Sequence, residues 1–101
     1  MDIKFKKTDD NILTVNASGK IDIETAVEYG TQITDAVDDN EITDLVLDFS
    51  EITYISSMGL RIILELHQKM KNIGSMKIIN VKDEILNIFK MTGFDKFLNI
   101  A

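Results

Sequence analysis

Apolar and polar residues alternate in two short stretches at the start of the chain. Residues 2–8 place apolar side chains between lysines, and this period of two predicts a strand at the edge of a sheet. A turn-forming run at residues 9–11 leads to a second strand pattern at residues 12–17, so we expect a β-hairpin. The sequence Ser18-Gly19-Lys20 interrupts the pattern, and the second strand is expected to end before it.

A helical pattern follows between residues 23 and 37. Apolar side chains recur there at intervals of three and four residues, which indicates an amphipathic helix with one buried face. Asp22 stands just before this stretch, where an aspartate side chain commonly accepts hydrogen bonds from the first free amides of a helix. We therefore expect Asp22 to be the N-cap.

Two more helices are predicted further along the chain, each with a wide apolar face. One spans residues 58–71, and Gly74 stands where a glycine often terminates a helix. The other starts at Asp83, its expected N-cap, and ends at Gly93.

Strands are predicted between these helices. Residues 45–49 are almost continuously apolar, which is typical of a strand buried on both faces in a parallel or mixed sheet. Residues 76–81 form another strand pattern, and residues 97–100 are a candidate for a short terminal strand. The order is then β-β-α-β-α-β-α with this terminal strand as an option. It predicts an α/β fold with one mixed sheet and helices packed mainly on one face.

The chain length and the net charge limit the classes of protein that this sequence can represent. A length of 101 residues with 45% apolar residues predicts a single domain spanning residues 1–101. The net charge of −6 argues against direct nucleic-acid binding, because such surfaces cluster Lys and Arg. The one tight basic group, Lys4, Lys6 and Lys7, suits the exposed side of an edge strand. No stretch approaches the roughly 18 apolar residues of a membrane span, and no signal-type run is present, so we expect a cytoplasmic protein without membrane contact.

Few residues suggest catalysis or cofactor binding. The chain has no Cys and one His, and nothing stands at a fixed spacing from His67 to complete a metal site or a catalytic base. The single glycines at positions 19 and 59 do not form a phosphate-binding loop. We therefore expect no enzyme, no metal and no cofactor.

The best candidate for a functional site is the stretch of residues 50–60. Two adjacent serines, Ser56 and Ser57, stand where the second helix should begin, and either hydroxyl could cap that helix. The stretch also follows the carboxyl end of a predicted buried strand, which is where α/β sheets tend to place their sites. Because of these positions, the serines are candidates for a functional role in addition to capping the helix.

A hydroxyl at a helix start could also carry a phosphate. The modification adds about −1.5 to −2 charges, and the free amides and the positive end of the helix dipole would tolerate that charge. A protein docked on the same surface would meet a hydrated dianion, whose burial without a counter-charge costs on the order of several kcal/mol. Beside the serines, Tyr54, Met58 and Gly59 are expected to form a small exposed apolar rim that suits a partner.

Three segments of the chain together resemble the STAS domain family, and within it the stand-alone bacterial anti-sigma factor antagonists. The segments are residues 17–26, 45–60 and 81–98, and they follow one another in the family's order over nearly the whole chain. The middle segment is the most specific. It contains the sequence Tyr54-Ile55-Ser56-Ser57-Met58-Gly59-Leu60.

The resemblance implies a phosphorylation-controlled regulator of transcription. Unphosphorylated members bind an anti-sigma factor, commonly one with a GHKL-type serine kinase domain, and thereby release the sigma factor. The kinase phosphorylates the serine two residues before the motif glycine, and a PP2C-type phosphatase restores it. By position that serine is Ser57, while Ser56, where many members carry Asp, stays open as the alternative.

The resemblance also implies which residues face the partner. They are Asp22, Ser56, Met58 and Arg61, beside Ser57 and Gly59. The STAS fold serves other roles as well, so a scaffold or sensor in a stressosome-like complex, or a small-ligand binder, stays open as an alternative function.

Overall fold

The computed structural model describes residues 1–101, and it contains six strands, three α-helices and one short 3₁₀ helix. The strands are β1 (Asp2–Lys7), β2 (Ile12–Ile21), β3 (Asp44–Asp48), β4 (Ile52–Ile55), β5 (Ser75–Ile79) and β6 (Asn99–Ile100). The helices are α1 (Ile23–Asp39), α2 (Ser57–Lys71), α3 (Asp83–Thr92) and the 3₁₀ helix η1 (Phe94–Lys96).

The strands form one mixed sheet in the order β1-β2-β3-β5-β6. β1 pairs with β2 as the antiparallel arm of a hairpin, and the remaining pairs are parallel. β4 pairs only with the carboxyl end of β2. The predicted hairpin, the mixed sheet, the central strand β3 and a short terminal strand are all confirmed.

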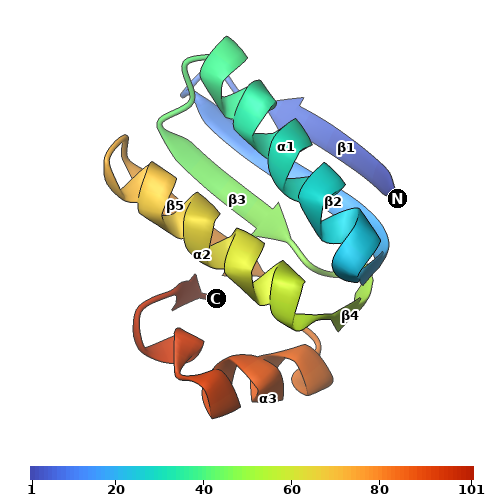
Figure 1. Cartoon of the computed structure of the whole chain (residues 1–101). Coiled ribbons are helices and arrows are strands. Elements are labelled where there is room, and N and C mark those ends of the chain that lie inside the picture. The colour runs from blue at the N-terminus through green and yellow to red at the C-terminus, as the bar shows by residue number, and fades with distance from the viewer.

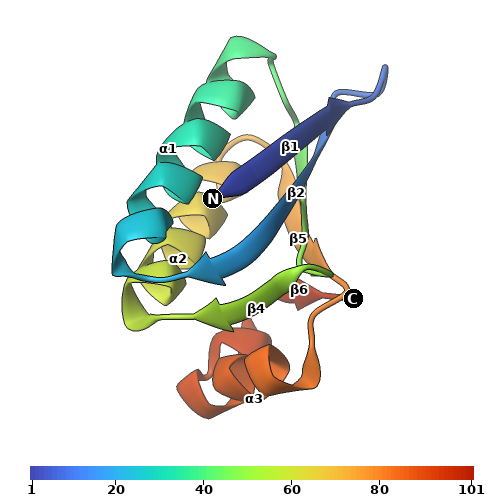
Figure 2. The ribbon, with the colours of Figure 1, turned by 90° about the vertical axis from the view of Figure 1, so that its right-hand side faces the viewer.

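Helices α1 and α2 lie side by side across the same face of the sheet (Figure 1). Figure 2 shows both helices on one side of the strands, with α3 below β4. The predicted packing of helices mainly on one face is therefore confirmed. The core lies between the sheet and these helices, where Val15, Tyr29 and Leu47 are fully or almost fully buried.

Two predictions about the strands were wrong. β2 does not end before Ser18, because Gly19 takes a φ of +108° and the pairing with β4 shifts register between Gly19 and Lys20. A left-handed φ is open to glycine at little cost, so Gly19 bends the strand and does not end it. β4, which lies inside the candidate stretch, was missed because only four residues form it, two of them exposed.

Two predictions about helix ends were also wrong. Lys82 is the N-cap residue of α3, and Asp83 is the first residue of that helix, where its charge still suits the helix dipole. Gly74 does not end α2, whose C-cap is Asn72. A side chain at Gly74 would collide with the carbonyl oxygen of Thr43, so close packing of two loops explains this glycine. Gly93 ends α3 in the left-handed conformation, as expected.

None of the helices is both long enough and apolar enough to cross a lipid bilayer. The lysines of β1 are exposed on the edge strand, as the alternating pattern predicts. The fold therefore presents a basic edge at β1, while the candidate serines lie at the start of α2.

Candidate functional site

The starts of α1 and α2 lie at the same end of the molecule because β2 and β4 are parallel neighbours. Ile21 at the end of β2 pairs with Ile55 at the end of β4. The backbone amide of Ser56 donates to the carbonyl oxygen of Ile21 at 2.8 Å. Each strand then turns directly into a helix, so two helix N-termini adjoin, as Figure 2 shows.

The two serines at the start of α2 have different environments. Ser56 is the N-cap, only 9% exposed, and its Oγ accepts a hydrogen bond from the amide of Gly59 at 3.1 Å. Ser57 is the first helical residue, and its side chain is exposed. In the structure, Ser56 therefore caps the helix and is buried, whereas Ser57 is the exposed serine of the two.

Ser57 lines a shallow pocket of about 470 Å³, and we refer to it as the Ser57 pocket. Ile23 and Tyr54, which are 70% and 47% exposed, bring apolar surface to it, while two carboxylates bring negative charge. The pocket combines the start of α1, the strand β4 and the start of α2. Its lining residues are Asp22, Ile23, Glu24, Tyr54, Ser56 and Ser57.

Asp22 is the N-cap of α1, as predicted. Its carboxylate accepts hydrogen bonds from the backbone amides of Glu24 and Thr25 at 3.0 and 2.9 Å. In return, the Thr25 hydroxyl accepts from the amide of Asp22 at 2.9 Å and donates to the carbonyl oxygen of Lys20 at 2.6 Å. This capping box fixes the position where the chain leaves β2 and enters α1.

These hydrogen bonds also lower the pKa of Asp22. The bond from the Thr25 amide contributes most. It is followed among the favourable effects by the Thr25 hydroxyl, whose Oγ1 lies 3.1 Å from Asp22 Oδ1, by the Glu24 amide and by the charge of Lys20, and together they outweigh desolvation. Each of them stabilises the ionised carboxylate. The carboxylate of Asp22 therefore stays ionised to a lower pH than an ordinary aspartate does.

We expect a pH-dependent difference in stability between the wild type and Asp22→Asn. A lowered folded-state pKa means that the carboxylate stabilises the fold above its unfolded pKa of about 3.9, and that this stabilisation is lost as the pH falls through the folded value. Asparagine caps helices without titrating. In urea unfolding at pH 7 and at pH 3, the advantage of the wild type should therefore shrink at the lower pH. An unchanged difference at both values would contradict the role of the carboxylate charge.

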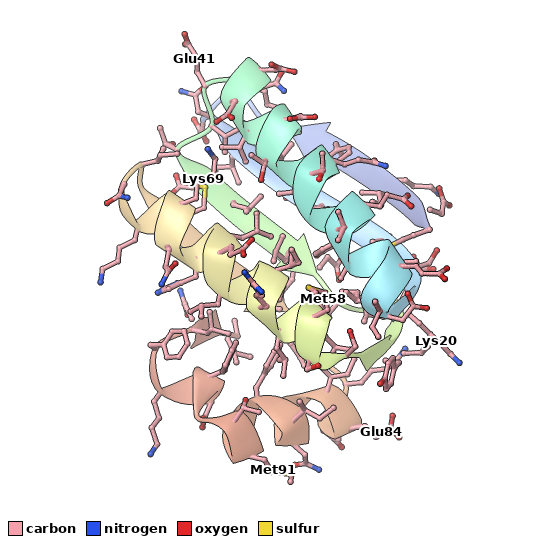
Figure 3. The ribbon with its side chains drawn as sticks, viewed as in Figure 1. Lys20, Glu41, Met58, Lys69, Glu84 and Met91 are labelled. Atoms are coloured by element: carbon pink, nitrogen blue, oxygen red, sulfur yellow. The ribbon has the colours of Figure 1, made fainter.

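The remaining predicted site residues lie around the start of α2, but they are not all at the surface. Met58 is half-buried and packs against the core, and Figure 3 shows it on the side of α2 that faces α1. Gly59 is buried against Ile55 and Ile21. Arg61 is exposed, and its Nε lies 3.3 Å from a carboxylate oxygen of Glu65.

The expected exposed apolar rim is therefore only partly correct. Tyr54 is exposed beside the serines, but Gly59 is buried, because it lets α2 approach β2 and β4 closely. Sequence reasoning missed Ile23, which is 70% exposed at the start of α1 and lines the Ser57 pocket. Its apolar side chain directly after the cap, outside the buried stripe of the helix, is the signal that could have identified it.

His67 lies on α2 and is half-buried, with its ring 5.3 Å from the ring of Phe97. This packing agrees with the prediction of a helix-flank residue. The Ser57 pocket is therefore lined by the hydroxyl-bearing residues Tyr54, Ser56 and Ser57, by two carboxylates and by apolar surface, and it does not include the histidine.

Comparisons with known proteins agree with this picture. Residues 4–101 match the STAS domain family. BtrV of Bordetella bronchiseptica, a candidate anti-sigma factor antagonist, is 26% identical over 93 residues, which make up 91% of this chain and 79% of that protein. The anti-sigma-B factor antagonist of Bacillus subtilis is 24% identical over 96 residues, or 94% of this chain and 86% of that protein.

A solved structure shows the same fold. The Bacillus cell fate determinant SpoIIAA in its phosphorylated form superimposes with a TM-score of 0.76 at 14% identity, over 99% of this chain and 91% of that one. The family match covers nearly the whole sequence, and it includes the strand–helix junctions that build the Ser57 pocket. The chain therefore belongs to the STAS domain family.

Proposed function

We propose that this protein is an anti-sigma factor antagonist that phosphorylation of Ser57 switches off. The observation that carries the proposal is the difference between the two serines: Ser57 is exposed in a pocket, whereas Ser56 is buried as the helix cap. The names of its relatives, which include the anti-sigma-B factor antagonist of Bacillus subtilis, support the same role.

In its unphosphorylated state, the Ser57 pocket suits a protein partner. Ile23 and Tyr54 offer apolar surface that binding would remove from water. Ser57 and Arg61 are exposed and would contact the partner directly. Asp22, Ser56, Met58 and Gly59 would act chiefly by shaping that surface, through the two caps and the packing below it.

A phosphate on Ser57 would change this surface without requiring a new fold. It would add about −1.5 to −2 charges at the first position of α2, where the helix dipole favours an anion. The pocket already holds Asp22 and Glu24, so its negative charge would roughly double. A partner that buries this surface would have to desolvate the dianion, and binding would weaken.

The partner in this proposal is an anti-sigma factor with a GHKL-type serine kinase domain, and a PP2C-type phosphatase reverses the modification. The kinase transfers the γ-phosphoryl group of ATP to the Ser57 Oγ. The bond between Oγ and phosphorus forms, the bond between phosphorus and ADP breaks, and the hydroxyl proton passes to a base of the kinase. The protein itself is the substrate in this reaction.

The test is phosphorylation of the purified protein by the GHKL-type kinases encoded in the same genome, with ATP, followed by mapping of the product by mass spectrometry. We expect one phosphate on Ser57, the same product from Ser56→Ala, and none from Ser57→Ala. Modification of Ser56, or no modification by any of these kinases, would overturn the proposal.

We further expect Ser57→Asp to bind the kinase at least about tenfold more weakly than the wild type, which corresponds to about 1.4 kcal/mol. The added carboxylate imitates part of the phosphate charge. Ser57→Ala should bind like the wild type, because it keeps the surface neutral. Isothermal titration of the three proteins measures this difference, and equal dissociation constants for Ser57→Asp and Ser57→Ala would refute exclusion by charge.

A further inference from the structure

We infer that Arg61 binds the phosphate of phosphorylated Ser57 within the same molecule, and that it leaves Glu65 to do so. The inference rests on the proposed function, because it concerns the modified state of Ser57. Arg61 would thus pair with one of two anions on α2: with Glu65 before the modification, and with the phosphate on Ser57 after it.

The spacing on α2 places Arg61 within reach of both anions. Ser57, Arg61 and Glu65 follow one another at intervals of four residues, so they lie on one face of the helix. Side chains at such intervals are neighbours, with Cβ atoms about 5–6 Å apart. Arg61 therefore stands midway between the hydroxyl that would carry the phosphate and the carboxylate that it contacts now.

The present contact of Arg61 with Glu65 is easily exchanged. It joins one guanidinium nitrogen, Nε, to one carboxylate oxygen at 3.3 Å. The two side chains are 71% and 55% exposed, and ion pairs between such exposed side chains contribute little to stability. Helical side chains also lean towards the N-terminus of the helix, so the direction of Ser57 is the intrinsically favoured one for Arg61.

The phosphate would be the stronger competitor for the guanidinium. It carries about twice the charge of the Glu65 carboxylate, and its oxygens can accept two parallel hydrogen bonds from an arginine. Among the neighbouring charges, the carboxylates of Asp22 and Glu24 line the same pocket and would repel the phosphate. Lys20 lies opposite Tyr54 in the pairing of β2 with β4, and it is another cation whose charge acts on the pocket residue Asp22.

This exchange would change the partner-binding surface in two ways at once. Before modification, Arg61 offers an exposed cation to the partner. After modification, the guanidinium of Arg61 pairs with the phosphate. The Glu65 carboxylate then has lost its ion-pair partner and adds a further negative charge to the surface. The partner would therefore lose a favourable contact and meet new negative charge in the same event.

The experiment uses the 101-residue chain made by chemical synthesis with phosphoserine at position 57, so that no kinase is needed. Titration of the phosphate by ³¹P NMR measures its second pKa, which is about 6 in an unperturbed phosphoserine. We expect Arg61→Ala to raise this pKa by about 0.2–0.4, which is the shift that the usual strength of an exposed ion pair at this spacing corresponds to. Arg61→Lys should restore most of the difference, and Glu65→Gln should lower the pKa below that of the parent.

Lys20→Ala is the matched control, because it removes the other nearby cation, and it should change the pKa less than Arg61→Ala does. Identical pKa values in the parent and in Arg61→Ala would overturn the inference, as would a larger effect of Lys20→Ala. Because the phosphate is installed chemically, a failure of the kinase experiment on Ser57 would leave this measurement intact. The two proposals can therefore fail separately.

Discussion

Phe89→Ala is expected to lower the free energy of unfolding by about 3–5 kcal/mol. Phe89 lies on α3 and is fully buried. Its ring centroid lies 6.2 Å from that of Phe49, just after β3, and 6.4 Å from that of Phe94 in η1. Truncation would leave a cavity where α3 meets the end of the central strand, and urea unfolding followed by circular dichroism measures the loss.

The control for this substitution is Met91→Ala on the same helix. Met91 is 86% exposed, and Figure 3 shows it at the outer side of α3, so its truncation should change the free energy of unfolding by no more than about 0.5 kcal/mol. If Phe89→Ala proved as mild as Met91→Ala, α3 would not contribute to the core as its burial indicates.

Gly59→Val is expected to destabilise the fold by about 3 kcal/mol, the upper end of the usual cost of overpacking. A Cβ atom at this position would come within 2.6 Å of Ile55 Cγ1 and 2.8 Å of Ile21 Cγ2. Both neighbours are buried, so neither can move aside freely. The first turn of α2 would have to shift away from β2 and β4, and Ser57 would move with it. Urea unfolding measures the loss of stability, and the rate of phosphorylation by the kinase reports the displacement of Ser57.

Ser57→Val provides the matched control for stability, because it introduces the same side chain two residues earlier at an exposed position. Its effect on the free energy of unfolding should stay within about 0.5 kcal/mol. Equal stabilities of Gly59→Val and Ser57→Val would show that α2 does not depend on close approach at Gly59.

Much of the fold was predictable because its elements carry local patterns. The helical period of α1, the cap at Asp22 and the continuous apolar run of β3 depend on residues close together in the sequence. Two of the errors concern glycines whose conformation or packing depends on residues distant in the sequence. Gly19 bends β2 towards β4, and Gly74 packs against Thr43, about thirty residues away in the sequence.

The same distinction between local patterns and distant contacts applies to the candidate site. Its location after β3 and at the start of α2 could be predicted, because a buried strand followed by two serines and a helical pattern is a local signal. Which serine is accessible could not be predicted from the residues alone, since both can cap a helix. The hydrogen bond from the Ser56 amide to Ile21 and the bond from the Gly59 amide to Ser56 Oγ decide it.

The sequence by itself determined the α/β class, the order of most elements and the stretch that holds Ser57, because period, caps and turns follow from neighbouring residues. Only the tertiary structure decided that Ile23 and Tyr54 line one pocket with Ser57, that Gly59 is buried, and that Ser56 is buried as the cap of α2. These facts follow from the parallel pairing of β2 with β4, two segments more than thirty residues apart. Burial and exposure at the site depend on that contact, and no local pattern in the chain encodes it.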